Sequence, residues 1–467
     1  MNDTKMTVLT NAKITVHAPS KEILAFAKTQ LSYTDKSKEY QLNKMASSAW
    51  GRNSPLFTKL KSEVSGQLYK YDPVSSVLEF SSGFYELFSN QFPGLPVEDR
   101  RCETGSVIAL PWADKPYDMR PYQEEAVELM LSSRRGVVNF ATGLGKTLLS
   151  VHLIKRNKKR ALVVCPSESV ASQFFSILEK SFGSNRVGFY GDGKKKIKDI
   201  TVGIAASISK NVTEFANNDL GLVIVDETHH TPASTFYAIA EGLGDVGKMF
   251  GLTATDYRSD GKDIMITGGC GPVIIRRDIK WGVDNGWLAE PYFIVQSVET
   301  TGRDIKGDKL KNYKEHVLNC PVMKARIEDD CRKMMAAGKS VLCLVDEVAH
   351  GQELSRALGI PFATGKDKQS QEYVEQLNDG KIPGLIGTDG KIGEGSDTKN
   401  VDVLILANFT VSKGPVIQAV GRGLRKQGTK TKCVILDYIP KGSTMLTRHA
   451  MMRVKIYREI TGKVKLN

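Results

Sequence analysis

The sequence lacks the features that mark membrane, secreted and disulfide-bonded proteins. No apolar run approaches the roughly 18 residues that a membrane-spanning helix needs, so we expect no membrane partner. The residues after Met1 contain no apolar segment of the signal-peptide kind. The seven cysteines are scattered and include no C-x-x-C pair, which predicts reduced thiols and no structural metal. These absences together predict a cytoplasmic protein.

Acidic residues are too few to balance the basic ones. The chain of 467 residues has 65 Lys and Arg against 52 Asp and Glu, which gives a formal net charge of +13. Such a surplus favours a polyanionic partner, above all a nucleic acid. Hydrophobic residues make up 41% of the chain, enough for about three domains of typical size to bury their own cores.

The apolar segment 136–140 is followed by a glycine-rich loop, Phe140-Ala-Thr-Gly-Leu-Gly-Lys-Thr147, and by the periodic segment 148–154. In such a strand, loop and helix order, backbone N–H groups and the helix N-terminus face phosphates, Lys146 neutralises their charge and Thr147 ligates Mg²⁺. An ordinary glycine turn is the alternative for the loop alone, because Phe140 replaces the first glycine of G-x-x-x-x-G-K-[ST]. The candidate nucleotide-binding residues are Ala141, Thr142, Gly143, Leu144, Gly145, Lys146 and Thr147.

A second apolar segment, 222–225, ends at two carboxylates. The segment indicates a buried parallel strand, and Asp226 stands at the strand end, where α/β sheets bind ligands. Asp226 can hold Mg²⁺ together with Thr147, while Glu227 can take a proton from the water that attacks the γ-phosphate. A solvated acidic turn is the alternative for this segment alone. His229 and His230 do not indicate a metal cluster, since no other His or Cys lies nearby at zinc spacing.

A run near the C-terminus, Gln418-Ala-Val-Gly-Arg-Gly-Leu-Arg425, supplies two arginines. An arginine inserted beside a γ-phosphate accelerates its transfer by as much as about 10³ to 10⁵. Arg422 and Arg425 are three residues apart, so on a helix they would share a face. We expect them in a second domain that completes the site when a cleft closes over ATP. A basic surface helix is the alternative.

In this order, the runs resemble the motifs of superfamily 2 helicases, over residues 120–425. The resemblance implies that Arg120, Tyr122 and Gln123 read adenine and that Gly395 and Asp397 meet the nucleotide from a second-domain motif. The catalytic residues that it implies are Lys146, Asp226, Glu227, Gln418, Arg422 and Arg425. The nucleic-acid contacts that it implies are Pro166, Ser167, Ser207 and Thr388.

The run Thr253-Ala-Thr255 resembles the motif that links hydrolysis to strand movement. RNA-unwinding relatives usually have Ser at its first position and His where Gln418 stands, so both residues favour DNA. Asp256 replaces the usual proline, which leaves the backbone of this motif less constrained. The N-terminal region and the ending 448–458 look most like phage junction-remodelling helicases, which implies the host cytoplasm as location.

The resemblance therefore implies an ATP- and Mg²⁺-dependent DNA helicase or translocase that remodels forks and Holliday-type junctions in replication, recombination or repair. An RNA helicase remains an alternative, as does an annealing protein that uses ATP as a switch. A switch protein needs no water-activating base, so Glu227 and the two arginines favour the motor.

The implied fold is α/β, with two tandem RecA-like parallel-sheet domains and a small N-terminal α/β accessory domain. Alternating apolar and amphipathic segments agree with parallel sheets. The expected boundaries are an accessory domain at 1–100, a linker at 101–117, a first RecA-like domain at 118–288, a second at 289–440 and a basic tail at 441–467. The accessory domain is a possible second DNA contact.

Three regions leave two interpretations open. We expect the aromatic residues of segment 69–88 in a core rather than stacked on bases. We expect Lys194-Lys-Lys-Ile-Lys198 to be a solvated turn rather than a phosphate contact. In the tail, apolar residues such as Met451 and Tyr457 could dock on the second domain while basic residues such as Arg453 meet phosphates, or the tail is a plain charged helix.

Overall fold

The computed structural model describes residues 6–47, 52–116, 118–229, 233–255, 260–364, 369–388, 398–409, 413–426 and 430–467. The chain divides into two compact units. The first comprises Met1–Phe140 and Gly145–Arg276, and the second comprises Ala141–Leu144 and Arg277–Asn467. Within the described residues, no helix is both long and apolar enough to cross a bilayer.

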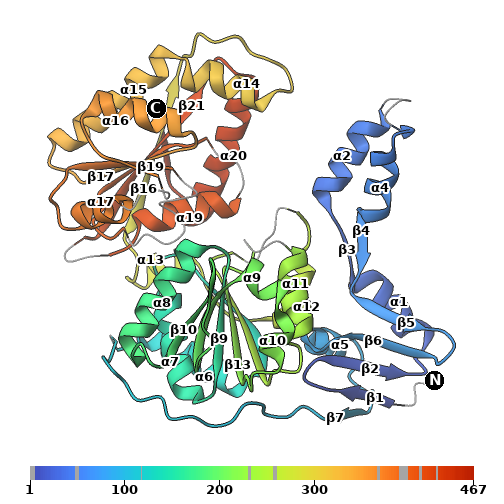
Figure 1. Ribbon diagram of the computed structural model, residues 1–467. Coiled ribbons are helices and arrows are strands. Elements are labelled where there is room, and N and C mark those ends of the chain that lie inside the picture. The colour runs from blue at the N-terminus through green and yellow to red at the C-terminus, as the bar shows by residue number, and fades with distance from the viewer. Residues whose placement is uncertain are drawn as a thin grey trace. The chain divides into compact units, whose positions relative to one another are not determined.

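An eight-stranded sheet forms the centre of the first unit, with strand order β11-β10-β12-β9-β13-β14-β8-β15 (Figure 1). The strands are β8 (Arg135–Phe140), β9 (Ala161–Cys165), β10 (Val187–Gly191), β11 (Lys194–Lys195), β12 (Ile200–Ile204), β13 (Leu222–Asp226), β14 (Lys248–Thr253) and β15 (Val273–Arg277). The helices are α6 (Pro121–Ser132), α7 (Lys146–Asn157), α8 (Glu168–Phe182), α9 (Ala205–Lys210), α10 (Val212–Ala216), α11 (Ala233–Gly242) and α12 (Asp263–Cys270).

Six neighbouring strands of this sheet, β10, β12, β9, β13, β14 and β8, pair in parallel. Every residue of β9 and β13 is buried, which explains their continuous apolar sequences, because both faces of a parallel sheet are covered. Parallel pairing also brings the carboxyl ends of these strands to one edge of the sheet. We call this edge the carboxyl edge.

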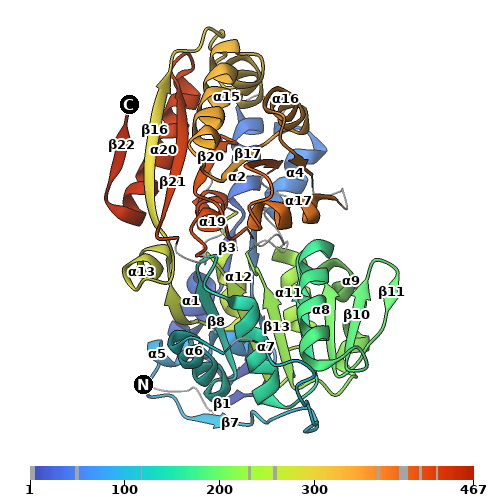
Figure 2. The ribbon, with the colours of Figure 1, turned by 90° about the vertical axis from the view of Figure 1, so that its left-hand side faces the viewer.

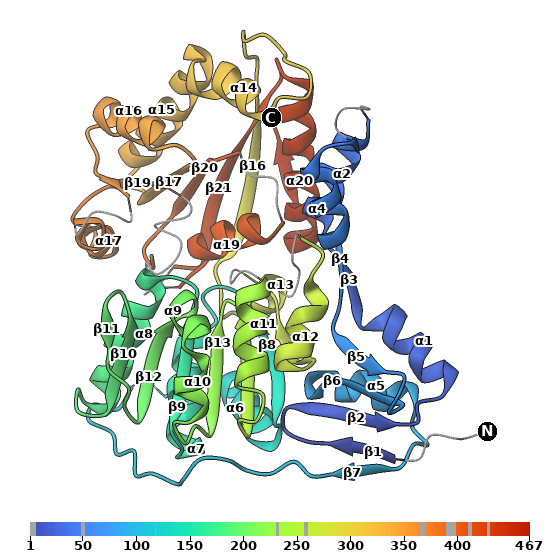
Figure 3. The same ribbon diagram turned by 45° about the vertical axis from the view of Figure 1, so that its right-hand side comes forward.

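The accessory domain has its own sheet, of order β5-β6-β2-β1-β7. Its strands are β1 (Met6–Leu9), β2 (Lys13–His17), β5 (Tyr69–Asp72), β6 (Val77–Ser81) and β7 (Val97–Asp99), and its helices α1 (Lys21–Gln30) and α5 (Tyr85–Gln91). Phe80, Phe84 and Phe88 are buried, as expected of core residues, whereas Tyr71 is exposed. A two-stranded ribbon, β3 (Ser32–Thr34) and β4 (Ser65–Gln67), leads to the helices α2 (Lys36–Ala46) and α4 (Pro55–Glu63), and we call these four elements the arm (Figure 3).

The accessory domain packs directly on the first RecA-like domain. Ala233 of α11 and Met265 of α12 belong to the same apolar core as its buried aromatic residues. At Gly83 an added Cβ would lie 2.3 Å from the carbonyl oxygen of Thr267, so only glycine allows this approach. Arg135 donates to the carbonyl oxygens of Asn11 at 2.8 Å and Gly244 at 2.7 Å. The two domains therefore share packing inside one unit.

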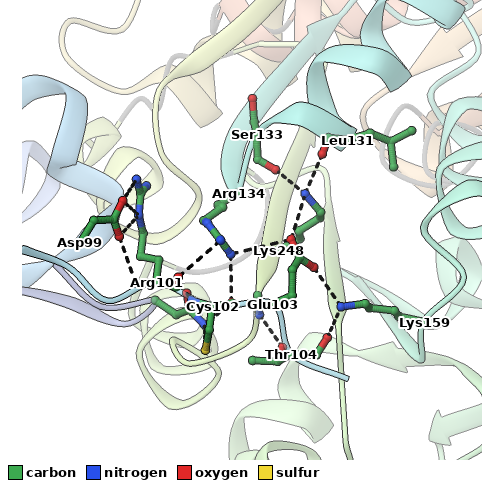
Figure 4. A network of polar contacts seen from close by, with 12 residues as sticks. Asp99, Arg101, Cys102, Glu103, Thr104, Leu131, Ser133, Arg134, Lys159 and Lys248 are labelled. Carbon is green, nitrogen blue, oxygen red and sulfur yellow. Dashed lines mark hydrogen bonds and ion pairs between the residues drawn. The ribbon is translucent and has the colours of Figure 1, made fainter. Parts of the chain in front are cut away.

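The segment that follows β7, part of the predicted linker, is held against the first RecA-like domain (Figure 4). Glu103 forms an ion pair with Lys159 at 2.9 Å and lies 3.7 Å from Lys248 and 3.8 Å from Arg134. Lys248 is buried and also donates to the carbonyl oxygens of Leu131 and Ser133. The exposed carboxylate of Glu103 thus lies close to three cations, and these contacts hold the segment after β7 in place.

The second unit contains a seven-stranded sheet of order β18-β19-β17-β20-β21-β16-β22 whose neighbouring strands pair in parallel (Figure 2). The strands are β16 (Glu290–Val298), β17 (Val341–Val345), β18 (Phe362–Ala363), β19 (Gly384–Thr388), β20 (Val403–Ala407), β21 (Lys432–Pro440) and β22 (Val464–Leu466). The helices are α13 (Ile279–Asp284), α14 (Lys309–Tyr313), α15 (Pro321–Ala336), α16 (Val348–Leu358), α17 (Gln369–Asn378), α19 (Lys413–Gly423) and α20 (Thr444–Thr461), with one π-helical turn at Lys314–Leu318. The predicted tandem α/β fold is confirmed.

The segment 441–467 is an integral part of this unit. Strand β22 pairs with β16, and Tyr457 of α20 is fully buried and stacks on Phe293 at 4.4 Å between ring centroids. Arg453 is also buried, and its guanidinium donates hydrogen bonds to both carboxylate oxygens of Asp437, each at 2.8 Å. The expectation that Arg453 meets phosphates is therefore wrong, because a buried charge must be paired inside the protein. Met451 is exposed, not docked.

Candidate functional site

The glycine loop ends in a backbone conformation that requires glycine. Gly145 has φ +80° and precedes α7, whose first residue is Lys146. An added Cβ at Gly145 would also lie 2.3 Å from Nε2 of Gln123. The free N–H groups at the N-terminus of α7, a helix of 12 residues, form the kind of site that binds phosphate. The Lys146 ammonium donates to the carbonyl oxygen of Phe140 at 3.2 Å, which keeps it beside the loop.

The segment expected to read adenine lies against this loop. Gln123 is buried, its Oε1 accepts from the backbone N–H of Arg120 at 2.8 Å, and its Nε2 lies 3.4 Å from the carbonyl oxygen of Gly145. Arg120 donates to the hydroxyl of Tyr122 at 3.0 Å, and the Tyr122 ring packs edge-on against Phe140. These contacts connect the start of α6 with the phosphate loop, and they leave the adenine role of the three residues a prediction.

Glu227 follows the last residue of β13 in a strained conformation. Its φ of +45° lies in the left-handed region, which costs a non-glycine residue roughly 1 to 3 kcal/mol. In this conformation Oε1 of Glu227 lies 3.1 Å from Nζ of Lys146. Such strain persists only where surrounding contacts maintain it, and it is concentrated at functional sites.

Asp226 is buried at the end of β13, beside Glu227. Burial, and next the negative charge of Glu227, raise the pKa of Asp226 to about 7, although Lys146 opposes this rise. Buried carboxylates with too little positive charge around them fit a divalent cation, which prefers oxygen ligands. Asp226 and Thr147, in the first turn of α7, are the residues that would hold Mg²⁺ here.

His229 connects the carboxylate site with the end of β14. Its Nδ1 lies 2.6 Å from Oγ1 of Thr253 and 3.5 Å from Oε2 of Glu227. The Thr253 hydroxyl donates its only proton to the carbonyl oxygen of Thr255 and accepts from the Thr255 N–H at 3.1 Å. Nδ1 of His229 must therefore carry a proton and donate it to Thr253. A continuous chain of contacts runs from Lys146 through Glu227 and His229 to Thr253.

His229 was considered from the sequence only as a metal ligand, and its connecting position was not predicted. Within the described residues no group of His, Cys, Asp or Glu could hold a metal ion through three such side chains. The available signal was the position of His229 in the Asp226-Glu-Thr-His229 run, two residues after the proposed base. His230 and Asp256 lie outside the described residues.

The remaining predicted residues lie as follows. Ala141, Thr142, Gly143 and Leu144 are grouped with the second unit, and Gly143 has φ +91°. Pro166 and Ser167 follow β9, Ser207 lies on α9 after β12, and Thr388 is the buried last residue of β19. Gly395 and Asp397 lie outside the described residues.

The two arginines do not share a helical face. Gln418 and Arg422 lie on α19, where Arg422 is buried, but the helix ends at Gly423, before Arg425. Two glycines at positions 421 and 423 lower the helix propensity there by about 1 kcal/mol each, which is the physical reason for the early end. The expectation of a common face is wrong, while the roles of both arginines stay predictions.

Sequence comparison finds similarity to helicases. Residues 116–258 match the family described as type III restriction enzyme, res subunit. The chain is 26% identical to the putative ATP-dependent helicase IRC3 of Saccharomyces cerevisiae, over 70% of this chain and 52% of that protein. It is 23% identical to the DNA 3'-5' translocase XPB2 of Sulfurisphaera tokodaii, over 72% of this chain and 84% of that protein. The chain spans 52% to 59% of the length of three curated relatives.

A solved structure with the same fold is the fragment of a putative HsdR subunit of a type I restriction enzyme from Vibrio vulnificus. The TM-score is 0.55 at 19% sequence identity, and the alignment covers 86% of this chain and 79% of that one. At this identity the similarity concerns the fold. It agrees with the tandem parallel sheets described above.

Proposed function

We propose, on the premise that the chain belongs with the superfamily 2 helicases, that it hydrolyses ATP to move along DNA and remodels branched DNA such as forks and four-way junctions. The observation that supports this best is the chain of contacts from Lys146 through Glu227 and His229 to Thr253. It joins the proposed hydrolytic base to the motif that is expected to couple ATP hydrolysis to movement along the nucleic acid.

Hydrolysis would begin with an exchange of partners at Lys146. In the structure its ammonium is paired with Glu227 at 3.1 Å. The phosphates of ATP would compete for this cation, and Glu227 would then be free to accept a proton from the attacking water. When bound by Asp226 and Thr147, Mg²⁺ would neutralise charge on the β- and γ-phosphate oxygens.

The second unit would supply Gln418, Arg422 and Arg425. We propose that one of the arginines stabilises the charge that develops on the γ-phosphate oxygens, and that Gln418 positions the nucleotide or the water. ATP binding would then favour closure of the two units, and hydrolysis would release it. This alternation would move the protein along a nucleic-acid backbone.

DNA is the substrate that the relatives' names support, since XPB2 is described as a DNA translocase. The preference for branches would come from the accessory domain. Its arm has basic residues and two exposed large side chains, Tyr40 and Leu56, and α2 has no buried residue. Its basic residues are Lys36, Lys38, Lys44, Lys59 and Lys61. Such a surface suits phosphates and unpaired bases at a branch point.

The test is steady-state ATP turnover with single strands, plain duplex, forks, four-way junctions and structured RNA of equal length. We expect the largest stimulation with forks or junctions, because only they engage both the motor and the arm. A maximum with structured RNA would favour the RNA-helicase alternative. Tight ATP binding without turnover on any substrate would favour the ATP-switched annealing protein.

A further inference from the structure

At one edge of the first sheet, β10 and β11 form a basic hairpin. Strands β10 and β11 pair antiparallel, with Tyr190 opposite Lys195 and Gly191 opposite Lys194. The two residues between them, Asp192 and Gly193, have φ of +49° and +74°. Positive φ at both positions is what a type I′ turn requires, and Asp-Gly is a preferred sequence for it. The hairpin therefore holds its lysines in a defined place.

A hollow of about 180 Å³ lies between this hairpin and the segment that contains α9. Ser207 and Lys210 line it on the α9 side, and Lys194 and Lys195 line it on the hairpin side. Figure 3 shows β10, β11 and α9 as neighbours at one end of the sheet. Glycines allow this approach, since an added Cβ at Gly203 would lie 2.4 Å from Cδ1 of Ile208.

The cations around the hollow are exposed and have no acidic partner. Lys194, Lys195, Lys196 and Lys210 are exposed, and within the described part of the chain none of them forms an ion pair. Two carboxylates lie near. Asp192 is exposed in the turn, while Glu214 accepts a hydrogen bond from the Tyr190 hydroxyl at 2.7 Å, which raises the pKa of Tyr190 to about 12. The surface is therefore net positive.

The hairpin continues a line of predicted nucleic-acid contacts along the carboxyl edge. Strands β9, β12 and β10 are neighbours in the sheet and run parallel, so the segments after them lie next to one another. Ser167 follows β9 and Ser207 follows β12. The turn and the strand β11, with Lys194 and Lys195, follow β10. The buried Ser167 hydroxyl has no hydrogen-bond partner in the described residues.

We infer that the β10–β11 hairpin and Lys210 form a phosphate-binding extension of the nucleic-acid path, which ends at the outer edge of the first sheet. The inference rests on the proposed function. It adds the place where the nucleic-acid backbone leaves the first RecA-like domain. Lysines line the hollow on both sides, and exposed lysines bind phosphates without reading sequence. The exposed lysines agree with the expected solvated turn, and the hollow that they share with Ser207 supports a phosphate contact in addition.

The test is DNA binding by the full chain with Lys194→Ala and Lys195→Ala combined, measured at salt concentrations from about 50 to 200 mM. Two lost phosphate contacts should lower the slope of log K against log salt by about 2 and weaken binding about tenfold at the low-salt end. ATP turnover without nucleic acid should not change. Lys194→Arg with Lys195→Arg should bind like the original protein, because arginine keeps the charge.

The matched control removes two exposed lysines that already have acidic partners, Lys333 with Asp329 and Lys381 with Asp379. It makes the same change in net charge and should leave the salt slope nearly unaltered. A third variant, Gly193→Val, keeps every lysine and disturbs the turn. It should weaken binding by an intermediate factor if the hairpin conformation matters.

The outcomes separate this inference from the proposed function. If nucleic acid stimulates turnover of the original protein and the double alanine variant has the same slope and affinity, the hairpin is not a contact and the inference fails. If no nucleic acid stimulates turnover of the original protein, the proposed function fails. Equal losses in the double variant and the matched control would show a general charge effect and also overturn the inference. Thermal unfolding of each variant checks that the fold is intact.

Discussion

Two parts of the carboxyl edge of the first sheet handle charge in opposite ways. At β8, β13 and β14 the charged groups are mostly buried and joined to one another, as in the pair of Lys146 with Glu227. At β10, β11 and β12 the cations are exposed and without acidic partners, as at Lys194 and Lys195. Both parts belong to one continuous sheet, so the difference comes from the side chains that follow each strand.

This difference in burial sets how strongly, and over what distance, the charges of each part interact. Between buried charges the effective dielectric constant is low, so one misplaced proton or cation changes the energy by several kcal/mol. Between exposed charges salt screens interactions beyond about 10 Å, and many weak contacts add up. The buried part suits the chemistry of one nucleotide. The exposed part suits a long polyanion that must be held and released repeatedly.

The strongest way to test the buried part is Glu227→Gln. The amide keeps the shape of the side chain and cannot take a proton from water, so turnover should fall by about 10²- to 10⁴-fold while ATP still binds. Steady-state turnover and equilibrium binding of a fluorescent ATP analogue measure the two effects. The control is Glu214→Gln in the exposed part, whose amide oxygen can still accept from Tyr190 and which should keep basal turnover. Normal turnover of Glu227→Gln would remove this residue from the mechanism.

The same contrast separates two ion pairs of the second unit. Asp437 and Arg453 have side chains that are 1% and 2% exposed, whereas Asp379 and Lys381 are both more than half exposed. Asp437→Asn leaves a buried guanidinium without its counter-ion and should lower the free energy of unfolding by about 3 to 5 kcal/mol. Asp379→Asn should lower it by about 1 kcal/mol or less. Urea unfolding followed by circular dichroism compares them, and equal losses would contradict the distinction.

The smallest effect is expected for a change at Thr253, in the motif that is expected to couple hydrolysis to movement. Thr253→Val keeps the volume of the side chain and removes the hydroxyl that links His229 to Thr255. Loss of about 1.4 kcal/mol of hydrogen bonding changes the equilibrium between coupled and uncoupled states by about tenfold, so the distance travelled per ATP should fall by up to about tenfold, with turnover less affected. Triplex displacement divided by ATP consumption gives this ratio. Thr201→Val, a buried threonine of β12 that bonds to Lys198, is the control and should leave the ratio unchanged.

The sequence was sufficient wherever a feature depends on neighbouring residues. The apolar segments 136–140 and 222–225 became β8 and β13 because continuous burial needs continuous apolar sequence. Gly145 was recognisable because its φ of +80° is accessible mainly to glycine. The α/β class predicts parallel sheets but not the order of the strands in each sheet, which had to come from the structure.

Features that depend on distant residues were not predictable. Arg453 looks like any basic residue of a charged helix until Asp437, sixteen residues earlier, is seen to lie against it. His229 connects to the end of β14 through Thr253, and Lys194 shares a hollow with residues of α9. Neither contact is visible in the sequence around these residues. The segment 101–117 was expected to be a linker, and the contacts of Glu103 with three cations depend on residues from 134 to 248.

The docking of the accessory domain affects how the chain folds during synthesis. Strand β7 pairs with β1, so the sheet of this domain is complete only after residue 99 has been made. Its apolar surface is then covered by α11 and α12, which end at Gly242 and Cys270. At about 5 to 20 residues per second, the ribosome needs roughly 10 to 30 s to supply them. During that interval the surface around Phe84 has no covering helices, and a chaperone that binds apolar segments has its opportunity.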